Sequence, residues 1–373
     1  MLLAVVTVAM PGQHVQAQGA ALGTVSGIVQ AAPTNVPLPY AVVSIPALGV
    51  ERFSGAEGRF LLTGVAAGTH ELLVRRIGFV PQRQQITVSA NGTLSVTVSL
   101  VQVPVRLTGM LVRPTDRCRS PGLPDSVRFP EVAQLVGLLR ENASTYRALV
   151  RRYPFAYAQL RALGDLLPDG MQVRSVDTVM VPSLPTVQYR PGRVVQTEPG
   201  SRESFMAIPS IIDLVDPAFV ANHCFTYAGA SVHGSETWFR LDVRAAERLR
   251  SPDVHGAFYL DSASAQLRRM ELELSRPDRL LAALRAVRGV IAHSTFVEIA
   301  PGLSILDAVC AVNWRRSSRG VTPRHAAELQ TTVAWEFTSP PPDIERATAR
   351  EIPPWQLNAR LDRAAIPCAA AGP

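Results

Sequence analysis

The chain contains no lysine: all 37 of its basic residues are arginine, set against 30 acidic residues. It has no long uncharged apolar run, so we expect no transmembrane segment in the mature chain. Its four cysteines form no C-x-x-C pair, which disfavours the commonest zinc sites. A P-loop, a G-x-G-x-x-G turn after a strand and a G-x-S-x-G elbow are also missing. These absences argue against nucleotide, structural-zinc and serine-hydrolase chemistry, and we expect no cofactor.

The net charge is +7 and the isoelectric point is near 9.7, values that suit a nucleic-acid-binding protein. The arginines, however, are scattered, with pairs at 75–76, 151–152, 268–269 and 315–316. Dispersed pairs are typical of a solvated face of a strand or helix. We therefore expect no nucleic-acid partner.

Residues 23–100 are a series of short apolar segments separated by glycine, proline and asparagine turns. The expected strands lie at 24–29, 37–45, 59–62, 69–77, 85–88 and 94–100. Strands this short and this evenly spaced predict an all-β sandwich.

The order of these segments resembles the carboxypeptidase regulatory-like domain, a seven-stranded transthyretin-like sandwich. The resemblance covers about a fifth of the chain and rests on Gly27, Pro37-Leu38, Ala41-Val42-Val43, Gly58-Arg59-Phe60, Gly68, Leu72, Val74 and Gly78-Phe79. It implies a fold more firmly than a function. Members of that family accompany catalytic domains, precede TonB-dependent outer-membrane receptors, and occur in surface proteins that bind glycans or protein partners.

The N-terminus predicts export. An apolar stretch at 1–10 is followed by Val15-Gln16-Ala17, which places small residues where signal peptidase reads them. We expect a signal peptide at 1–17, a mature chain starting near Gln18, and a location in the periplasm or at the outer membrane or cell surface. The alternative is a buried N-terminal strand.

The even cysteine count of an exported chain predicts two disulfides. Three pairings are possible, and we expect Cys118 to pair with Cys224, and Cys310 with Cys368.

After the sandwich, 18–101, we expect a linker at 102–128, a second domain at 129–352 and a tail at 353–373. Pro130 starts a helix whose apolar stripe is formed by Val132, Leu135, Val136 and Leu139.

Residues 145–183 are ambiguous. Tyr146, Ala148 and Val150 alternate with polar or larger neighbours, as in a strand, and 155–167 has helical propensity. We favour a long β-hairpin that turns near Pro168-Asp169-Gly170.

Beyond a short helix or turn at 211–220, strands are expected at 224–228, 236–243, 256–260, 266–274, 293–299, 305–314 and 328–338, with a short helix at 279–288. The predicted fold class is mainly β: the sandwich is followed by a curved antiparallel sheet with one to three short helices.

Residues 256–269 follow the pattern G-x-x-[FWY]-[IL]-D-x-x-[TS]-x-x-L-R-R, a strand–turn–strand hairpin in which the Asp261 side chain closes the turn. This hairpin resembles that of periplasmic lipoprotein-carrier-like half-barrels.

His233 and Glu236 form an H-x-x-E pair, the spacing of two ligands in zinc carboxypeptidases. A third ligand would come from His255, His293 or His325, none of which lies in a supporting motif. If a strand begins at Glu236, His233 lies in the preceding turn, and nothing fixes its ring beside the carboxylate. We predict no metal site and no catalytic residue.

Several other polar and aromatic residues have a structural interpretation. Asp213 and Asp216 suit helix capping better than calcium binding, and His70 suits a hydrogen-bonded strand. The sequons at Asn91 and Asn142 are not expected to be glycosylated. Trp238, Phe239, Phe258 and Tyr259 are spaced as core residues of strands rather than as a sugar platform.

The favoured hypothesis is a non-enzymatic exported binding protein whose partner is a cell-envelope protein or a glycan. The alternative is a carrier in which the second domain encloses a lipid or another apolar ligand; a zinc carboxypeptidase-like hydrolase is the least favoured. A carrier requires an apolar cavity between sheet and helix, whereas a binder of the first kind has that space filled.

Overall fold

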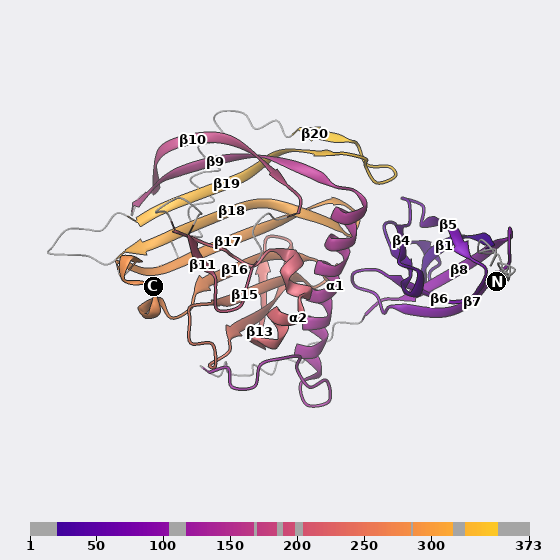
Figure 1. The fold of residues 1–373 in the computed structure, drawn as a ribbon, viewed down its shortest axis with the longest axis horizontal. Helices are drawn as coiled ribbons and strands as arrows, with labels where there is room; N and C mark the ends of the chain where they lie inside the picture. The colour runs from indigo at the N-terminus through magenta and orange to yellow at the C-terminus, as the bar shows by residue number, and fades with distance from the viewer. Residues whose placement is uncertain are drawn as a thin grey trace, which may run out of the picture.

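A computed structural model describes residues 21–103, 117–167, 170–184, 189–197, 204–284, 286–315 and 325–349. The chain forms two domains, a small sandwich and a larger domain built on one curved sheet (Figure 1). The expected signal peptide and the C-terminal tail lie outside the described residues and stay predictions. Residues 104–116 of the expected linker also lie outside the described residues.

The first domain is a sandwich of two four-stranded sheets. One contains β1 (Leu22–Ala32), β2 (Val36–Pro37), β5 (Arg59–Ala66) and β8 (Thr93–Val101); the other contains β3 (Val42–Ile45), β4 (Val50–Phe53), β6 (Gly68–Arg75) and β7 (Gln82–Val88). Inward-facing residues such as Phe60 and Leu62 alternate with exposed ones along β5. Gly58 takes φ +71°, and a Cβ there would lie 2.4 Å from the Val29 carbonyl oxygen, so only glycine fits. The sandwich is confirmed; the two-residue β2 makes eight strands instead of seven.

The second domain is built on a ten-stranded antiparallel sheet with the order β10-β9-β19-β18-β17-β16-β15-β14-β13, and β20 lies beside β19. Its strands are β9 (Phe155–Leu167), β10 (Gly170–Pro182), β13 (His223–His233), β14 (Glu236–Ala245), β15 (Val254–Asp261), β16 (Leu267–Leu274), β17 (Val287–Ala300), β18 (Leu303–Arg315), β19 (His325–Phe337) and β20 (Ala347–Ala349). The sheet curves around α1 (Pro130–Arg152) and α2 (Pro217–Ala221), as Figure 1 shows. The favoured β9–β10 hairpin and the curved antiparallel sheet are confirmed.

Helix α1 is longer than expected, at 23 residues. The alternation of Tyr146, Ala148 and Val150 does not mark a strand, because all three residues lie in this helix. The apolar stripe that starts at Leu135 and Leu139 continues through Tyr146 at helical spacing, and it faces the sheet along the whole helix. The helical spacing of the apolar residues is therefore clear only over a longer stretch of sequence.

The helix expected at 279–288 is also wrong. Two short 3₁₀ turns, η3 (Pro277–Arg279) and η4 (Ala282–Leu284), precede β17, which already begins at Val287. Val287 pairs with Arg315 of β18, so strand pairing overrides the local helical propensity.

Asn142 fixes α1 on the β15–β16 hairpin. It is 3% exposed, its Nδ2 donates to the carbonyl oxygen of Ala265 at 2.9 Å, and its Oδ1 accepts from the Leu267 amide at 2.8 Å. In the same turn, the Asp261 carboxylate accepts from the amide and the hydroxyl of Ser264, which confirms that Asp261 closes the turn. Buried Asn142 thus has a structural role.

Replacing Asn142 by alanine should lower the free energy of unfolding by about 2 kcal/mol, because a buried amide and a buried carbonyl lose their partner. Chemical denaturation followed by circular dichroism measures the change. Arg140→Ala, at an exposed position of the same helix, is the control and should shift the value by less than about 0.5 kcal/mol. Equal stability of the Asn142 and Arg140 variants would contradict the docking role.

The sandwich contacts α1 and the β17–β18 turn through the arginine pair at 75–76. The scattered arginine pairs were expected to lie on solvated faces. Arg75 donates to Glu141 of α1 at 2.9 Å and to the Ser144 hydroxyl at 3.0 Å. Burial lowers the pKa of Arg76 to about 10, against the opposing effect of Glu298. Arginine pairs are therefore not always solvated: this one lies at the contact between the domains.

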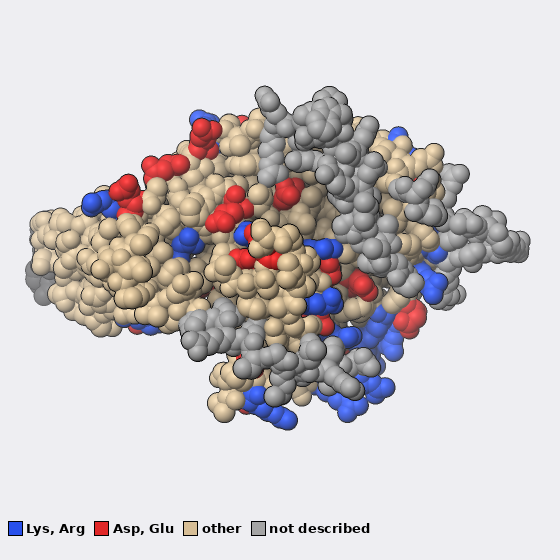
Figure 2. Space-filling model, turned by 180° about the vertical axis from the view of Figure 1, so that it is seen from behind, with Lys and Arg blue, Asp and Glu red and all other residues tan. Residues whose placement is uncertain are grey.

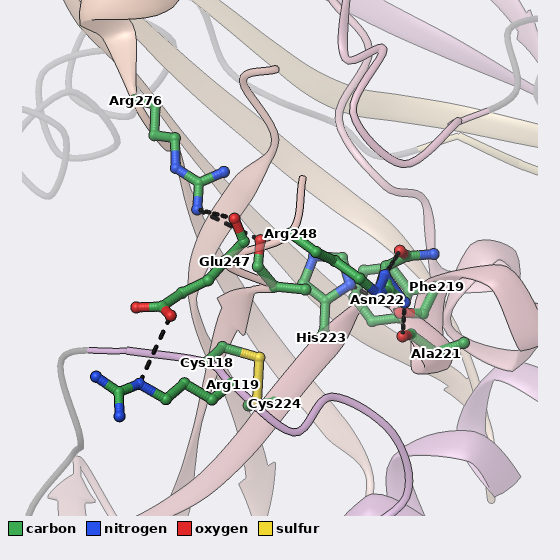
Figure 3. The surroundings of a disulfide bond; sticks show 11 residues. Cys118, Arg119, Phe219, Ala221, Asn222, His223, Cys224, Glu247, Arg248 and Arg276 are labelled. Atoms are coloured by element: carbon green, nitrogen blue, oxygen red, sulfur yellow. Dashed lines mark hydrogen bonds and ion pairs between the residues drawn. A yellow bond between two sulfur atoms is a disulfide. The ribbon is translucent and has the colours of Figure 1, made fainter. Parts of the chain in front are cut away.

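A disulfide ties the segment before α1 to β13, an edge strand of the sheet. Cys118 and Cys224 are bonded, with their Cα atoms 5.5 Å apart, which confirms the first expected pairing (Figure 3). Cys118 also forms a β-bridge with Ala246. Cys310 is disulfide-bonded too, but its expected partner Cys368 lies outside the described residues.

On the face that Figure 2 shows, charged side chains of both signs are interspersed. In Figure 2, basic residues become more frequent along the lower edge of the second domain, at the end away from the sandwich. Among the described residues, no helix has the length and apolar character to cross a membrane.

Candidate ligand-binding pocket

An apolar pocket of about 270 Å³ lies between the sheet and the helix-bearing side of the second domain. Its floor is formed by five neighbouring strands, β9, β19, β18, β17 and β16, and its walls by α1, the end of β10 and the segment 208–212. The lining residues are Tyr146, Tyr157, Val181, Pro182, Ser183, Ile208, Pro209, Ser210, Ile211, Ile212, Met270, Ser294, Phe296, Leu306, Val309 and Gln330.

The strand residues reach the pocket because alternate side chains of each strand point to the face covered by α1. Met270 and Phe296 point inward and belong to the main core, whereas Arg269, next to Met270 along β16, forms an ion pair with Glu271. The pocket therefore borders the main core and is also open to the surface.

Two tyrosines are the titratable residues of the lining, and three serines and Gln330 add further polar groups. The hydroxyls of Tyr146 and Tyr157 lie 2.7 Å apart, and Tyr146 also donates to the Ser183 carbonyl at 3.3 Å. Burial raises the pKa of Tyr157 to about 12 and raises that of Tyr146 well above its usual range. Both phenols are neutral at physiological pH, so they can orient a polar end of a ligand but supply no charge.

The wall segment is held by capping interactions. Asp213 accepts from both the amide and the hydroxyl of Ser210 at 2.7 Å, which closes η2 (Ile211–Val215). Asp216 accepts from the Ala218 amide and caps α2. Burial raises the pKa of Asp213 despite these bonds. The capping interpretation of both aspartates is confirmed.

His233 and Glu236 are not among the residues that line the pocket, and they have other partners. His233 is the last residue of β13 and pairs directly with Glu236, so it is not in the turn where the sequence placed it. Its ring stacks on Trp238 at 4.1 Å, and its Nε2 lies 2.8 Å from the Ser231 hydroxyl. Glu236 accepts from Trp238 and from Arg268.

The three histidines considered as third ligands are separate from this pair. His255 lies 3.3 Å from Glu273 and holds the pKa of that carboxyl below its usual range. His293 accepts from Arg269, burial lowers its pKa, and His325 accepts from the Arg315 amide. In the described part of the chain, no three histidine, cysteine or acidic side chains cluster in a way that would hold a metal ion. The expectation of no metal site stays a prediction.

Most of the remaining structural interpretations fit the contacts. His70 bonds to the Ala66 carbonyl, and Phe239, Phe258 and Tyr259 are buried. Trp238 is only half-buried, so the core interpretation is wrong for this residue. The pocket itself carries no sequence motif, because its lining comes from eight separate segments. The one sequence feature that could have indicated the pocket is the apolar segment 208–212, which leads into η2.

Comparison with known proteins supports the first domain directly. Residues 24–101 match the family model of the carboxypeptidase regulatory-like domain, as the sequence resemblance predicted. No curated protein matches the chain.

Among solved structures, the chain is similar to a minor pilin of Streptococcus agalactiae, with 16% identity over 24% of this chain and 48% of the pilin, at a TM-score of 0.21. It thus spans less than half of that pilin. It is also similar to a LolA superfamily protein from Nitrosomonas europaea, with 9% identity over 58% of this chain and 94% of that chain, at a TM-score of 0.28. A DUF1329 family protein from Desulfovibrio piger shares 9% identity over 62% of this chain and 98% of that chain, at a TM-score of 0.28. Scores this low assign no ligand.

Proposed function

We propose that this protein is a non-enzymatic, exported binding protein of the bacterial cell envelope whose second domain holds an apolar ligand in the pocket beside α1. The observation that carries the proposal is the apolar cavity between sheet and helix. Of the two binding hypotheses, this cavity favours the carrier. Recognition of a cell-envelope protein or glycan by the sandwich stays a prediction.

The size of the pocket defines the class of ligand. Its volume of about 270 Å³ is near the lower end of the range for small-molecule sites, roughly 300–1,000 Å³. A single alkyl or acyl chain suits such a space. Each buried methylene contributes about 0.8 kcal/mol, so affinity should rise with chain length until the pocket is full.

The chemistry of the lining supports binding rather than catalysis. The titratable lining groups are Tyr146 and Tyr157, and both are protonated near neutral pH because burial raises their pKa. A general base must lose its proton near the working pH, which neither phenol does.

The test uses the neutral fluorescent probe N-phenyl-1-naphthylamine and a series of straight-chain alcohols as competitors. The full-length protein should bind one probe molecule, and displacement should strengthen with each added methylene up to a limiting length. Ser294→Phe places a ring in the pocket and should weaken probe binding about tenfold or more, because the space is then occupied.

Thr237→Phe, on an exposed part of β14, adds the same ring away from the pocket and serves as the control. Circular dichroism should show that both variants are folded. Equal probe affinity in wild type and Ser294→Phe, or no dependence on alcohol chain length, would reject the pocket as the ligand site.

A further inference from the structure

A second, chemically different cleft lies outside the apolar pocket. It has a volume of about 680 Å³, and three arginines line it: Arg190 and Arg193 from the turn before β11 (Val195–Thr197), and Arg279 from η3. Leu280 and Leu281 extend the lining with apolar surface, and Leu281 is 69% exposed. None of the lining residues is acidic, so the cleft combines concentrated positive charge with an apolar rim.

The three guanidinium groups are available to a ligand. All three residues are exposed, and none forms an ion pair within the described part of the chain. Arg279 donates only to the Arg250 carbonyl, at 3.2 Å. Other arginines of this domain form ion pairs. Arg268, for example, is only 15% exposed and bonds to Glu236. Three unpaired guanidinium groups repel one another unless an anion lies between them.

The turn that carries Arg190 and Arg193 is held in place by a buried aspartate. Asp253, fully buried, accepts from the Tyr189 hydroxyl at 2.6 Å and from the Gly192 amide at 2.7 Å. The Arg193 amide donates to the Arg190 carbonyl at 2.9 Å and closes the turn. Because Asp253 uses its oxygens on these donors, it holds the turn in place and does not reach the guanidinium groups. Preorganised donors lower the entropic cost of binding an anion.

The opposite wall is also held by the protein. Arg276 takes the left-handed conformation before η3, at φ 52°, and its guanidinium donates to the carbonyls of Leu249 and Ala246. These bonds connect the turn that carries Arg279 with the segment that leads to Ser251 and Pro252 on the cleft wall. Figure 3 shows Arg276 reaching towards this segment, close to Glu247.

We propose that this cleft binds the phosphate group of an amphiphilic ligand, with the guanidinium groups of Arg190, Arg193 and Arg279 on the phosphate oxygens. Planar guanidinium groups bind phosphate through paired N–H···O bonds, and Leu280 and Leu281 are placed to contact apolar atoms next to it. The site goes beyond the apolar pocket, because it recognises charge and lies on different elements. A lipid headgroup and a soluble phosphate ester share this chemistry.

Isothermal titration of the full-length protein separates these sources. The probes are dihexanoylphosphatidylglycerol below its micelle concentration, dihexanoylphosphatidylcholine and inorganic phosphate. We expect the anionic lipid to bind about tenfold tighter than the zwitterionic one, and to weaken at higher salt. Tighter binding of the lipid than of inorganic phosphate assigns a lipid source, whereas equal binding assigns a soluble phosphate.

The variants test the residues. Arg190→Ala and Arg193→Ala should each weaken binding of the anionic lipid about tenfold, the loss expected for a charge-assisted hydrogen bond. Arg59→Ala, an exposed arginine of the sandwich, should leave it unchanged. N-phenyl-1-naphthylamine should bind all of these variants as it binds wild type, which separates the cleft from the pocket. Failure of both anionic probes to bind, or unchanged affinity in the two cleft variants, would overturn the proposal.

Discussion

Replacing Asp253 by alanine is expected to destabilise the second domain by about 3–5 kcal/mol, the cost of breaking a buried charged network. The carboxylate is fully buried and accepts from the Tyr189 hydroxyl and from the amides of Gly192 and Val254 at 2.6–2.7 Å. Without it, three donors lose their acceptor, two of them buried.

The neighbouring groups cannot replace the lost acceptor. Burial and Asp253 itself raise the pKa of Tyr189 well above its usual range, so the phenol remains a donor. Burial lowers the pKa of His223, and the neutral ring stacks on Phe219 at 4.2 Å, with its Nδ1 2.8 Å from the Phe219 carbonyl oxygen. His223 therefore stays in place but supplies no compensating bond to the turn.

Urea unfolding followed by tryptophan fluorescence measures the free energy of unfolding of the Asp253 variant. Asp278→Ala removes an exposed aspartate from a neighbouring turn and is the control, with an expected change of less than about 0.5 kcal/mol. A loss below about 1 kcal/mol for Asp253→Ala would show that the turn is held by other contacts.

The double substitution Cys118→Ala and Cys224→Ala should lower the free energy of unfolding by about 4 kcal/mol. The bond joins residues 106 positions apart, and closing a loop of about 100 residues removes entropy from the unfolded chain worth roughly 4.7 kcal/mol at 25 °C. The predicted loss is set somewhat lower, because native disulfides typically contribute about 2–4 kcal/mol.

Denaturant titration of the oxidised protein and of the double variant measures this difference. After full reduction, the wild type and the variant should be equally stable, because neither then has a disulfide, whereas the oxidised variant keeps the bond of Cys310. Equal stability of the oxidised wild type and the variant, or free thiols at both positions in the oxidised protein, would contradict the account.

Local patterns predicted the parts of the fold that local chemistry determines. Alternation along 59–62 and the tight turn at Gly58 identified the sandwich, and the Asp261 side chain identified the β15–β16 turn. Local patterns predicted the wrong secondary structure where contacts with distant residues determine it. Val287 joins a strand because Arg315 pairs with it, and Tyr146 lies in a helix whose period appears only over a longer window.

The candidate sites were harder to predict than the fold. The pocket depends on where α1 lies over five strands, and no short segment contains more than a few of its lining residues. The role of Asn142 was hidden because an asparagine in a sequon suggests the surface, whereas its partners lie more than 120 residues away. The H-x-x-E pair was conspicuous in the sequence, yet its side chains bond to Ser231, Trp238 and Arg268.

A crystal structure of the protein with bound 10-bromodecan-1-ol tests the central claim most directly, because the anomalous signal of bromine locates the end of the alkyl chain. The account predicts one strong bromine peak inside the pocket bounded by Met270, Phe296 and Ile211, with the alcohol oxygen close to the paired hydroxyls of Tyr146 and Tyr157. A fully occupied ligand at any other place, with this pocket filled by rearranged side chains, would contradict it.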